Sequence, residues 1–241
     1  MSIKKHIPNT ITCCNLISGC IATSYAFEGE LSMALLWIVM GAVFDFFDGM
    51  VARLLHVSSP IGKELDSLAD DVTFGVAPAT MVFYELSIID YPAVLEPWRD
   101  YVPYTAFLIA AFSALRLAKF NLDERQTMGF IGLPTPANAL FWGSLLAGMP
   151  QLIEQTHYAL PIMVVLIVLS CYLLVCELPM FALKFKQWGF KGNEVKYGFV
   201  CASVALLAVA GVMKGFWMVI VLYILTSLLM LTKKNSNAPQ A

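Results

Sequence analysis

Charged residues are scarce in this chain, and this scarcity excludes a water-soluble domain. Asp, Glu, Lys and Arg make up 13% of the residues, where an average soluble protein has about a quarter. Hydrophobic residues make up 59%, and the mean hydropathy is +0.73. The sequence has no basic tract of the kind that binds nucleic acid. Its six cysteines lack CxxC or Cys/His metal spacing, so they are interpreted as small apolar residues rather than as a disulfide framework or a metal site.

Apolar segments recur along nearly all of the 241 residues, which indicates one integral membrane domain with an all-α, polytopic bundle of transmembrane helices. The run after Lys4 and Lys5 resembles a signal peptide, but its polar residues and the lack of a convincing cleavage site favour a retained first helix. Hydropathy predicts eight spans, at about 9–27, 31–54, 63–88, 101–121, 133–150, 158–183, 197–212 and 215–232.

The distribution of Lys and Arg predicts the orientation of these spans. Thirteen of the 15 fall on one side of the predicted bundle, and only Arg99 and Lys214 fall on the other. Because Lys and Arg accumulate in cytoplasmic loops, both termini are expected in the cytoplasm, in a multi-pass protein of the inner (cytoplasmic) membrane. The inverted repeats of many transporters are not apparent by eye.

Four aspartates interrupt the apolar pattern at the predicted cytoplasmic face. Asp45 and Asp48 are three residues apart, and Asp66 and Asp70 are four apart, so each pair shares a helical face. The short connection between the two spans should bring all four carboxylates to one space. Clustered carboxylates without His or thiolate suit hard cations, and four of them could hold two Mg²⁺ or Mn²⁺ ions.

The residues beside the aspartates suit a phosphate ligand. Gly49 and Ala52 remove side-chain bulk, Arg53 can present a bidentate fork, and Gly62 keeps the third helix open. Two divalent ions are a known arrangement for phosphoryl chemistry. Small residues also serve helix packing, and paired intramembrane carboxylates also line cation paths. A divalent cation transporter therefore remains an alternative.

Taken together, the pattern is Asp45-x2-Asp48-Gly49-x2-Ala52-Arg53-x8-Gly62-x3-Asp66-x3-Asp70. It resembles the complete signature of the CDP-alcohol phosphatidyltransferase family. The resemblance covers about residues 1–185, as a six-helix catalytic core; 186–232 would form two additional helices and 233–241 a polar tail. The stretches IPNTITCCNLISGCIA, ALRLAKFNLDE and FIGLPTPANAL are similar to the bacterial phosphatidylserine synthases of this family.

The resemblance implies transfer of the phosphatidyl group from CDP-diacylglycerol to L-serine at the cytoplasmic face, giving phosphatidylserine and CMP. Asp45 and Asp66 would contact both metal ions and Asp48 one of them. Asp70 would contact the second ion and accept the proton of the serine hydroxyl. A homodimer is also implied. Glycerol phosphate, inositol phosphate or another alcohol remains open as the acceptor.

Further site residues follow from the same resemblance. The serine carboxylate needs a cation. Arg116 is the first candidate, for that carboxylate or for the lipid phosphate, while Lys119 is interpreted as an interfacial anchor. Asp71, turned about 100° from Asp70, is expected behind the site or on the surface. The CDP-diacylglycerol contacts would be Gly49, Ala52, Arg53, Ser59 and Gly62, with Asn9 and Thr12, for which helix capping is an equal alternative. Polar acceptor contacts would come from Asn121, Thr135 and Asn138.

Overall fold

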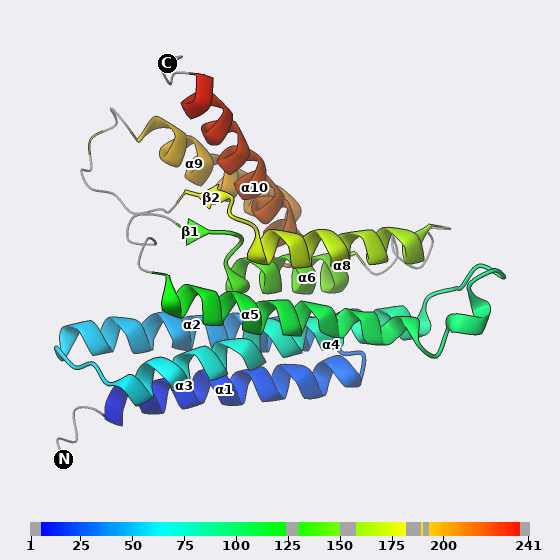
Figure 1. The fold of residues 1–241 in the computed structure, drawn as a ribbon, viewed down its shortest axis with the longest axis horizontal. Coiled ribbons are helices and arrows are strands. Elements are labelled where there is room, and N and C mark those ends of the chain that lie inside the picture. The colour runs from blue at the N-terminus through cyan, green and yellow to red at the C-terminus, as the bar shows by residue number, and fades with distance from the viewer. Residues whose placement is uncertain (1–5, 124–129, 150–157, 182–188, 190–192, 237–241) are drawn as a thin grey trace.

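The computed structural model describes residues 6–123, 130–149, 158–181, 189 and 193–236, and helices dominate it (Figure 1). The α-helices are α1 (His6–Phe27), α2 (Leu31–Leu54), α3 (Pro60–Asp70), α4 (Ala77–Ile88), α5 (Leu108–Leu122), α6 (Thr135–Gly148), α8 (Ala159–Val175), α9 (Glu194–Ala210) and α10 (Val212–Ser236). The short elements are the π-helical η2 (Asp71–Val76), the 3-10 turns η3 (Glu96–Trp98) and η4 (Val102–Phe107), and the strands β1 (Phe130–Ile131) and β2 (Pro179–Met180).

Most predicted spans coincide with helical segments. The third predicted span is the continuous run of α3, η2 and α4, and the fourth is η4 followed by α5. Within the described residues, four segments are long and apolar enough to cross a membrane: His6–Phe27, Leu31–Leu54, Val102–Leu122 and Met213–Thr232. The protein is therefore membrane-embedded and predominantly α-helical, while the count of eight spans stays a prediction.

The sixth predicted span, 158–183, is wrong at its end. Helix α8 stops at Val175, and β2 then pairs antiparallel with β1, Ile131 opposite Pro179. Pro179 offers no backbone N–H and disfavours helix at the residue before it, so the chain leaves the helix before this point. Gly132 follows β1 with φ +75, and a Cβ there would lie 2.8 Å from the carbonyl oxygen of Leu174. The two-stranded ribbon was not predicted.

The connections lie at two opposite ends of the bundle. The start of α1, the α2–α3 connection and the last turns of α5 and α8 lie at one end, and the α1–α2 and α4–α5 connections lie at the other (Figure 1). This alternation matches the two sides inferred from the sequence. Which side faces the cytoplasm stays a prediction. Several of the counted cations lie outside the described residues: Lys4, Lys5, Arg125, Lys184, Lys186 and Lys191.

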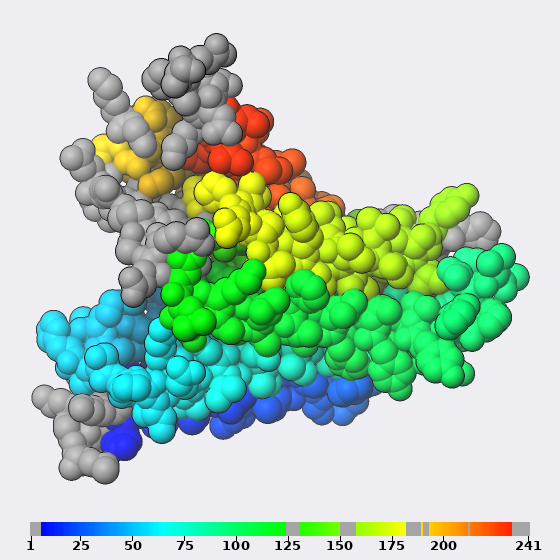
Figure 2. Space-filling model, viewed as in Figure 1, coloured from blue at the N-terminus to red at the C-terminus, as the bar shows by residue number. Residues whose placement is uncertain are grey.

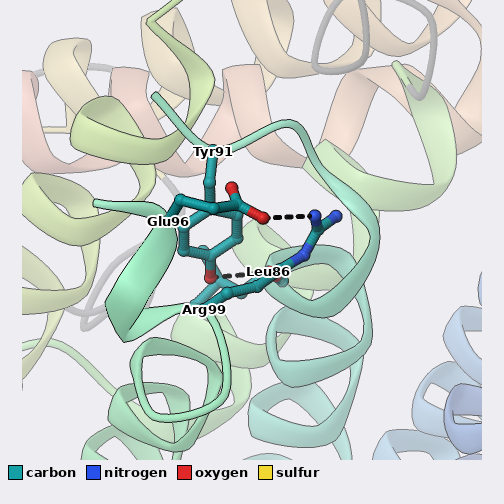
Figure 3. Close-up of polar contacts among 4 residues, drawn as sticks. All are labelled: Leu86, Tyr91, Glu96 and Arg99. Atoms are coloured by element: carbon teal, nitrogen blue, oxygen red, sulfur yellow. Dashed lines mark hydrogen bonds and ion pairs between the residues drawn. The ribbon is translucent and has the colours of Figure 1, made fainter. Parts of the chain in front are cut away.

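The connection between α4 and α5 is stabilised by its own side chains (Figure 3). The Tyr91 hydroxyl donates to the carbonyl oxygen of Leu86 at 2.9 Å, and the Arg99 guanidinium lies 5.4 Å from the centroid of the Tyr91 ring. Arg99 also pairs with Glu96 at 3.1 Å. Burial raises the pKa of Tyr91, and the nearby Arg99 partly opposes that shift. These contacts fix the end of the bundle that lies away from the four aspartates.

The core forms where α1, α2, α4, α6 and α8 meet. Its largest fully buried side chains include Leu35, Ile38, Phe74 and Trp142. Helix α1 packs against both α2 and α3, so α1 is the common neighbour of the two helices that carry the aspartates. This packing brings polar side chains of α1 into the site.

Candidate active site: a carboxylate cluster beside a cavity

Three of the four predicted metal ligands come together. One carboxylate oxygen from each of Asp45, Asp48 and Asp66 lies within 4.8 Å of the others. Asp48 is buried, and the other two are partly exposed. Among the described residues, no Lys, Arg or His nitrogen forms a salt bridge with these carboxylates, since the one salt bridge found there joins Arg99 and Glu96. The cluster therefore concentrates negative charge that the described side chains do not neutralise, and its all-oxygen donor set fits a hard divalent cation.

Asp70 lies outside this 4.8 Å group, although the sequence predicted all four carboxylates in one space. It is one helical turn after Asp66 and lies near enough to Asp45 and Asp66 to interact electrostatically with both. Its Oδ1 accepts a hydrogen bond of 3.0 Å from Nδ2 of Asn15. Asp70 is thus adjacent to the cluster, with one oxygen oriented by α1.

Helix α1 orients Asp48 as well. The Thr12 hydroxyl lies 2.6 Å from Oδ2 of Asp48 and 3.1 Å from the carbonyl oxygen of Pro8. Thr12 and Asn15 are one turn apart, so they face the aspartates from the same side of α1. Thr73 in turn donates to the carbonyl oxygen of Asn15 at 3.0 Å. The capping alternative for Thr12 and Asn9 is wrong, because both residues lie inside α1, which already includes His6.

A cavity of about 270 Å³ opens beside the cluster, and we call it the α1–α3 cavity. Asp48 and Asp66 lie in its wall. Six of the seven residues predicted to contact CDP-diacylglycerol line it: Asn9, Thr12, Gly49, Ala52, Ser59 and Gly62. The seventh, Arg53, is exposed, and its guanidinium lies 3.5 Å from where a Cβ on Gly49 would be.

The shape of the α1–α3 cavity depends on how α3 begins. Ser59 is the N-cap of α3, because its hydroxyl accepts a 3.1 Å hydrogen bond from the backbone N–H of Gly62 and Pro60 occupies the first turn. A Cβ on Gly62 would lie 3.0 Å from both the Ser59 hydroxyl and Oδ1 of Asn9. Glycine at position 62 therefore keeps these two polar atoms accessible from the cavity.

A second cavity, of about 370 Å³, contains Arg116, and we call it the Arg116 cavity. The Arg116 side chain is 6% exposed, and its Nε and Nη2 have no hydrogen-bond partner. The guanidinium carbon lies 5.1 Å from the Phe120 ring centroid, and Asp70 is within Coulombic reach. Buried unpaired donors are costly, so they indicate an anionic ligand here. The lining residues are Arg116, Lys119, Leu122, Asp123, Ile131, Leu174, Val175, Cys176 and Glu177.

The other predicted acceptor residues are not among the lining residues of either cavity. Asn121 ties α5 to α3, because its Nδ2 donates to the Ser67 hydroxyl at 2.7 Å and its carbonyl accepts from Nζ of Lys63 at 2.9 Å. Asn138 is buried and accepts from the Ser170 hydroxyl at 2.6 Å. Thr135 is fully buried, with no partner for its hydroxyl.

Asp71 points away from the cluster, toward α5. Its Oδ1 lies 2.7 Å from the place that a Cβ on Gly75 would take, and Cβ of Ser113 lies 3.0 Å from the same place. This agrees with its expected position behind the site.

Asn15 and Lys63 are site residues that the sequence reasoning missed. Asn15 binds Asp70, and Lys63 lines the α1–α3 cavity. The signal for Asn15 was available, because a polar residue one turn after Thr12 in an apolar helix requires a partner. Lys63 was counted only as a cytoplasmic cation.

Comparison with known proteins agrees with the carboxylate geometry. A family model described as CDP-alcohol phosphatidyltransferase matches residues 5–190. Among similar proteins, three are named CDP-diacylglycerol–serine O-phosphatidyltransferase. The Bacillus subtilis protein is 39% identical over 132 residues, which cover 55% of this chain and 70% of that protein. The Methanocaldococcus jannaschii protein is 35% identical over 156 residues (64% and 66%). The Helicobacter pylori J99 protein is 36% identical over 135 residues (55% and 54%).

The matched range contains both aspartate pairs, every residue that lines the α1–α3 cavity, and Arg116. The match covers more than three quarters of the chain, including the segment in which the carboxylates, the small residues and Arg53 have the family spacing. This chain belongs to the CDP-alcohol phosphatidyltransferase family.

Proposed function

We propose that the protein transfers the phosphatidyl group of CDP-diacylglycerol to the hydroxyl of L-serine, releasing CMP. The observation that carries the proposal is that two aspartates of the three-aspartate cluster, Asp48 and Asp66, lie in the wall of a cavity lined by six residues predicted to contact CDP-diacylglycerol. The names of the similar proteins support serine as the acceptor. Nothing in the described residues favours glycerol phosphate or inositol phosphate.

Asp45, Asp48, Asp66 and Asp70 would hold two divalent cations, Mg²⁺ or Mn²⁺. Each intramembrane carboxylate costs about 2.5–3.5 kcal/mol at a helix centre, and the like charges of the cluster repel one another, so a counter-charge is needed. When bound, the two ions would offset the charge of the diphosphate and of the departing CMP. Thr12 and Asn15 would set the orientation of two of the four carboxylates.

The α1–α3 cavity would hold the cytidine diphosphate of the donor. Gly49, Ala52 and Gly62 leave room for it, and Arg53 and Lys63 can offer positive charge to the phosphates. The lipid chains would then extend into the bilayer. The active site would face the cytoplasm, at the end of the bundle that carries most of the Lys and Arg residues.

Asp70 would act as the general base. Asn15 holds its Oδ1, which leaves Oδ2 to accept the proton of the serine hydroxyl. The serine oxygen then forms a bond to the phosphorus that carries diacylglycerol, the bond from that phosphorus to the CMP oxygen breaks, and CMP leaves. Arg116 would bind the serine carboxylate in the Arg116 cavity, because its two unpartnered nitrogens suit a carboxylate.

Residues 1–185 would form the catalytic core, with 186–232 as an addition and 233–241 as a tail, and the proposed assembly is a homodimer. Arg53, Asn121, Thr135 and Asn138 remain proposed contacts of the substrates. For Asn121 and Asn138, the hydrogen bonds described above support a role in fixing helices α3, α5, α6 and α8 rather than direct contact.

The test is CMP release from CDP-diacylglycerol by detergent-purified protein with Mg²⁺ or Mn²⁺, with L-serine present or omitted. We expect serine-dependent release that Asp70→Asn abolishes and Asp71→Asn retains, since Asp71 faces α5. CMP release with glycerol phosphate or inositol phosphate but not with serine would show that the acceptor is a different alcohol. Mg²⁺ flux into liposomes without turnover of the lipid would favour a transporter instead.

A further inference from the structure

The C-terminal helix α10 packs on β2, next to the chain segment that lines the Arg116 cavity, although α10 lies beyond the range matched by the family model. Ile220 of α10 is buried in a small apolar cluster with Leu133 and with Met180 of β2. Figure 2 shows the yellow segment around β2 lying between the green end of α5 and the orange-red α10. This segment begins at Cys176 and Glu177, which line the cavity. Helix α10 therefore supports the wall from its outer side.

Tyr223 of α10 is the polar part of this contact. Its hydroxyl donates to the carbonyl oxygen of Phe181 at 2.9 Å, directly after β2. Its ring centroid lies 4.9 Å from that of Phe181 and 6.0 Å from that of Phe199 in α9. Both C-terminal helices thus contact Phe181, the residue that follows β2.

Tyr223 also interacts electrostatically with Arg116. Besides the Phe120 ring, the buried guanidinium lies near enough to Asp70 and to Tyr223 of α10 to interact electrostatically with both. The Tyr223 hydroxyl donates its hydrogen bond to the carbonyl oxygen of Phe181, so its oxygen keeps its lone pairs free to face a cation.

We propose that α10 is a functional part of the acceptor site and that Tyr223 is a positioning residue. It would fix the cavity wall through Phe181 and orient Arg116 toward the carboxylate of a small amino-acid acceptor. This inference rests on the proposed function, in which the Arg116 cavity takes the acceptor. It gives the two C-terminal helices a role that neither the family signature nor the family match assigns.

The test measures kcat and both KM values for Tyr223→Phe, with Tyr172→Phe as the matched control, since Tyr172 is exposed on α8. We expect Tyr223→Phe to raise the KM for serine about three- to tenfold, because this is the size of effect that follows from the loss of one buried hydrogen bond. The KM for CDP-diacylglycerol should stay within twofold of wild type. In the double variant with Arg116→Lys, the effects of the two substitutions on the KM for serine should be non-additive, because Tyr223 acts through Arg116.

A second pair of variants tests the apolar part of the contact. Ile220→Ala should raise the KM for serine in the same selective way, while Leu225→Ala, at an exposed position of α10, should match wild type. Equal changes in both KM values, or a lowered thermal midpoint with unchanged KM values, would overturn the inference. A wild-type protein without serine-dependent release would instead refute the proposed function, and the inference would fall with it.

Discussion

Replacing Thr12 by valine tests whether α1 tunes metal binding. Valine keeps the shape of threonine but removes the hydroxyl that lies 2.6 Å from Oδ2 of Asp48. A hydrogen bond to a charged group contributes about 1.5–3 kcal/mol, and loss of a partner behind a metal ligand costs about 10–100-fold in metal affinity. Because about 1.4 kcal/mol corresponds to a factor of ten, the two ranges agree.

We therefore expect the Mn²⁺ concentration for half-maximal activity to rise about 10–100-fold in Thr12→Val. Saturating Mn²⁺ should restore most of kcat, since the four aspartates are intact. The assay is CMP release as a function of free Mn²⁺, with direct Mn²⁺ binding measured by electron paramagnetic resonance on the same preparation.

Thr10→Val is the matched control. Thr10 lies on the same helix and donates to the carbonyl oxygen of His6 at 2.9 Å, as Thr12 does to that of Pro8, but Thr10 is exposed. The control thus removes the same kind of bond within the helix without touching Asp48. Thr12→Ser should behave like wild type. An unchanged Mn²⁺ requirement in Thr12→Val, or a loss of activity that metal does not restore, would refute the reasoning.

Three further predictions concern the cavity, the ion and the ribbon. Gly62→Ala should raise the KM for CDP-diacylglycerol severalfold, because its Cβ would lie 3.0 Å from Asn9 and Ser59. Gly198→Ala is the control and should leave this KM unchanged, because nothing lies within 4 Å of its Cβ. Equal KM values for the two variants would contradict the cavity assignment. Chelation by EDTA should abolish CMP release, and Mg²⁺ or Mn²⁺ should restore it. Full activity in EDTA would refute the proposed metal requirement. Gly132→Ala should lower the thermal midpoint, because φ +75 costs a non-glycine residue about 1–2 kcal/mol and the Cβ would crowd the Leu174 carbonyl; an unchanged midpoint would contradict that strain.

Much of the fold was predictable from the sequence because a membrane span leaves a long apolar signal. The limits of α2, Leu31–Leu54, were predicted without error. The end of α8 was not predicted, because apolar residues continue past Val175 and only Glu177 and Pro179 interrupt them before Lys184. The ribbon depends on pairing between segments that are distant in sequence, and a strand of two residues has no periodicity to detect.

The aspartates were predictable because their spacing is a local property of each helix. Their partners depend on which helices are neighbours. The sequence suggested direct contact between the second and third spans, but α1 packs against both, and this is why Thr12 and Asn15 reach Asp48 and Asp70. The same limit applies to Arg116. Its position near a helix end made it a candidate cation for the acceptor, but its burial and the cavity that contains it are visible only in the tertiary structure.

The position of Asp70 explains why it, rather than another aspartate, suits the role of base. Asp48 and Asp66 line the α1–α3 cavity, where the donor would bind. Asp70 lies near enough to the cluster and to Arg116 to interact electrostatically with both, although it lines neither cavity. A hydroxyl that enters beside Arg116 would therefore be near Asp70. In the proposed reaction, Asp70 would take the proton beside the acceptor, and Asn15 fixes one oxygen of its carboxylate in place.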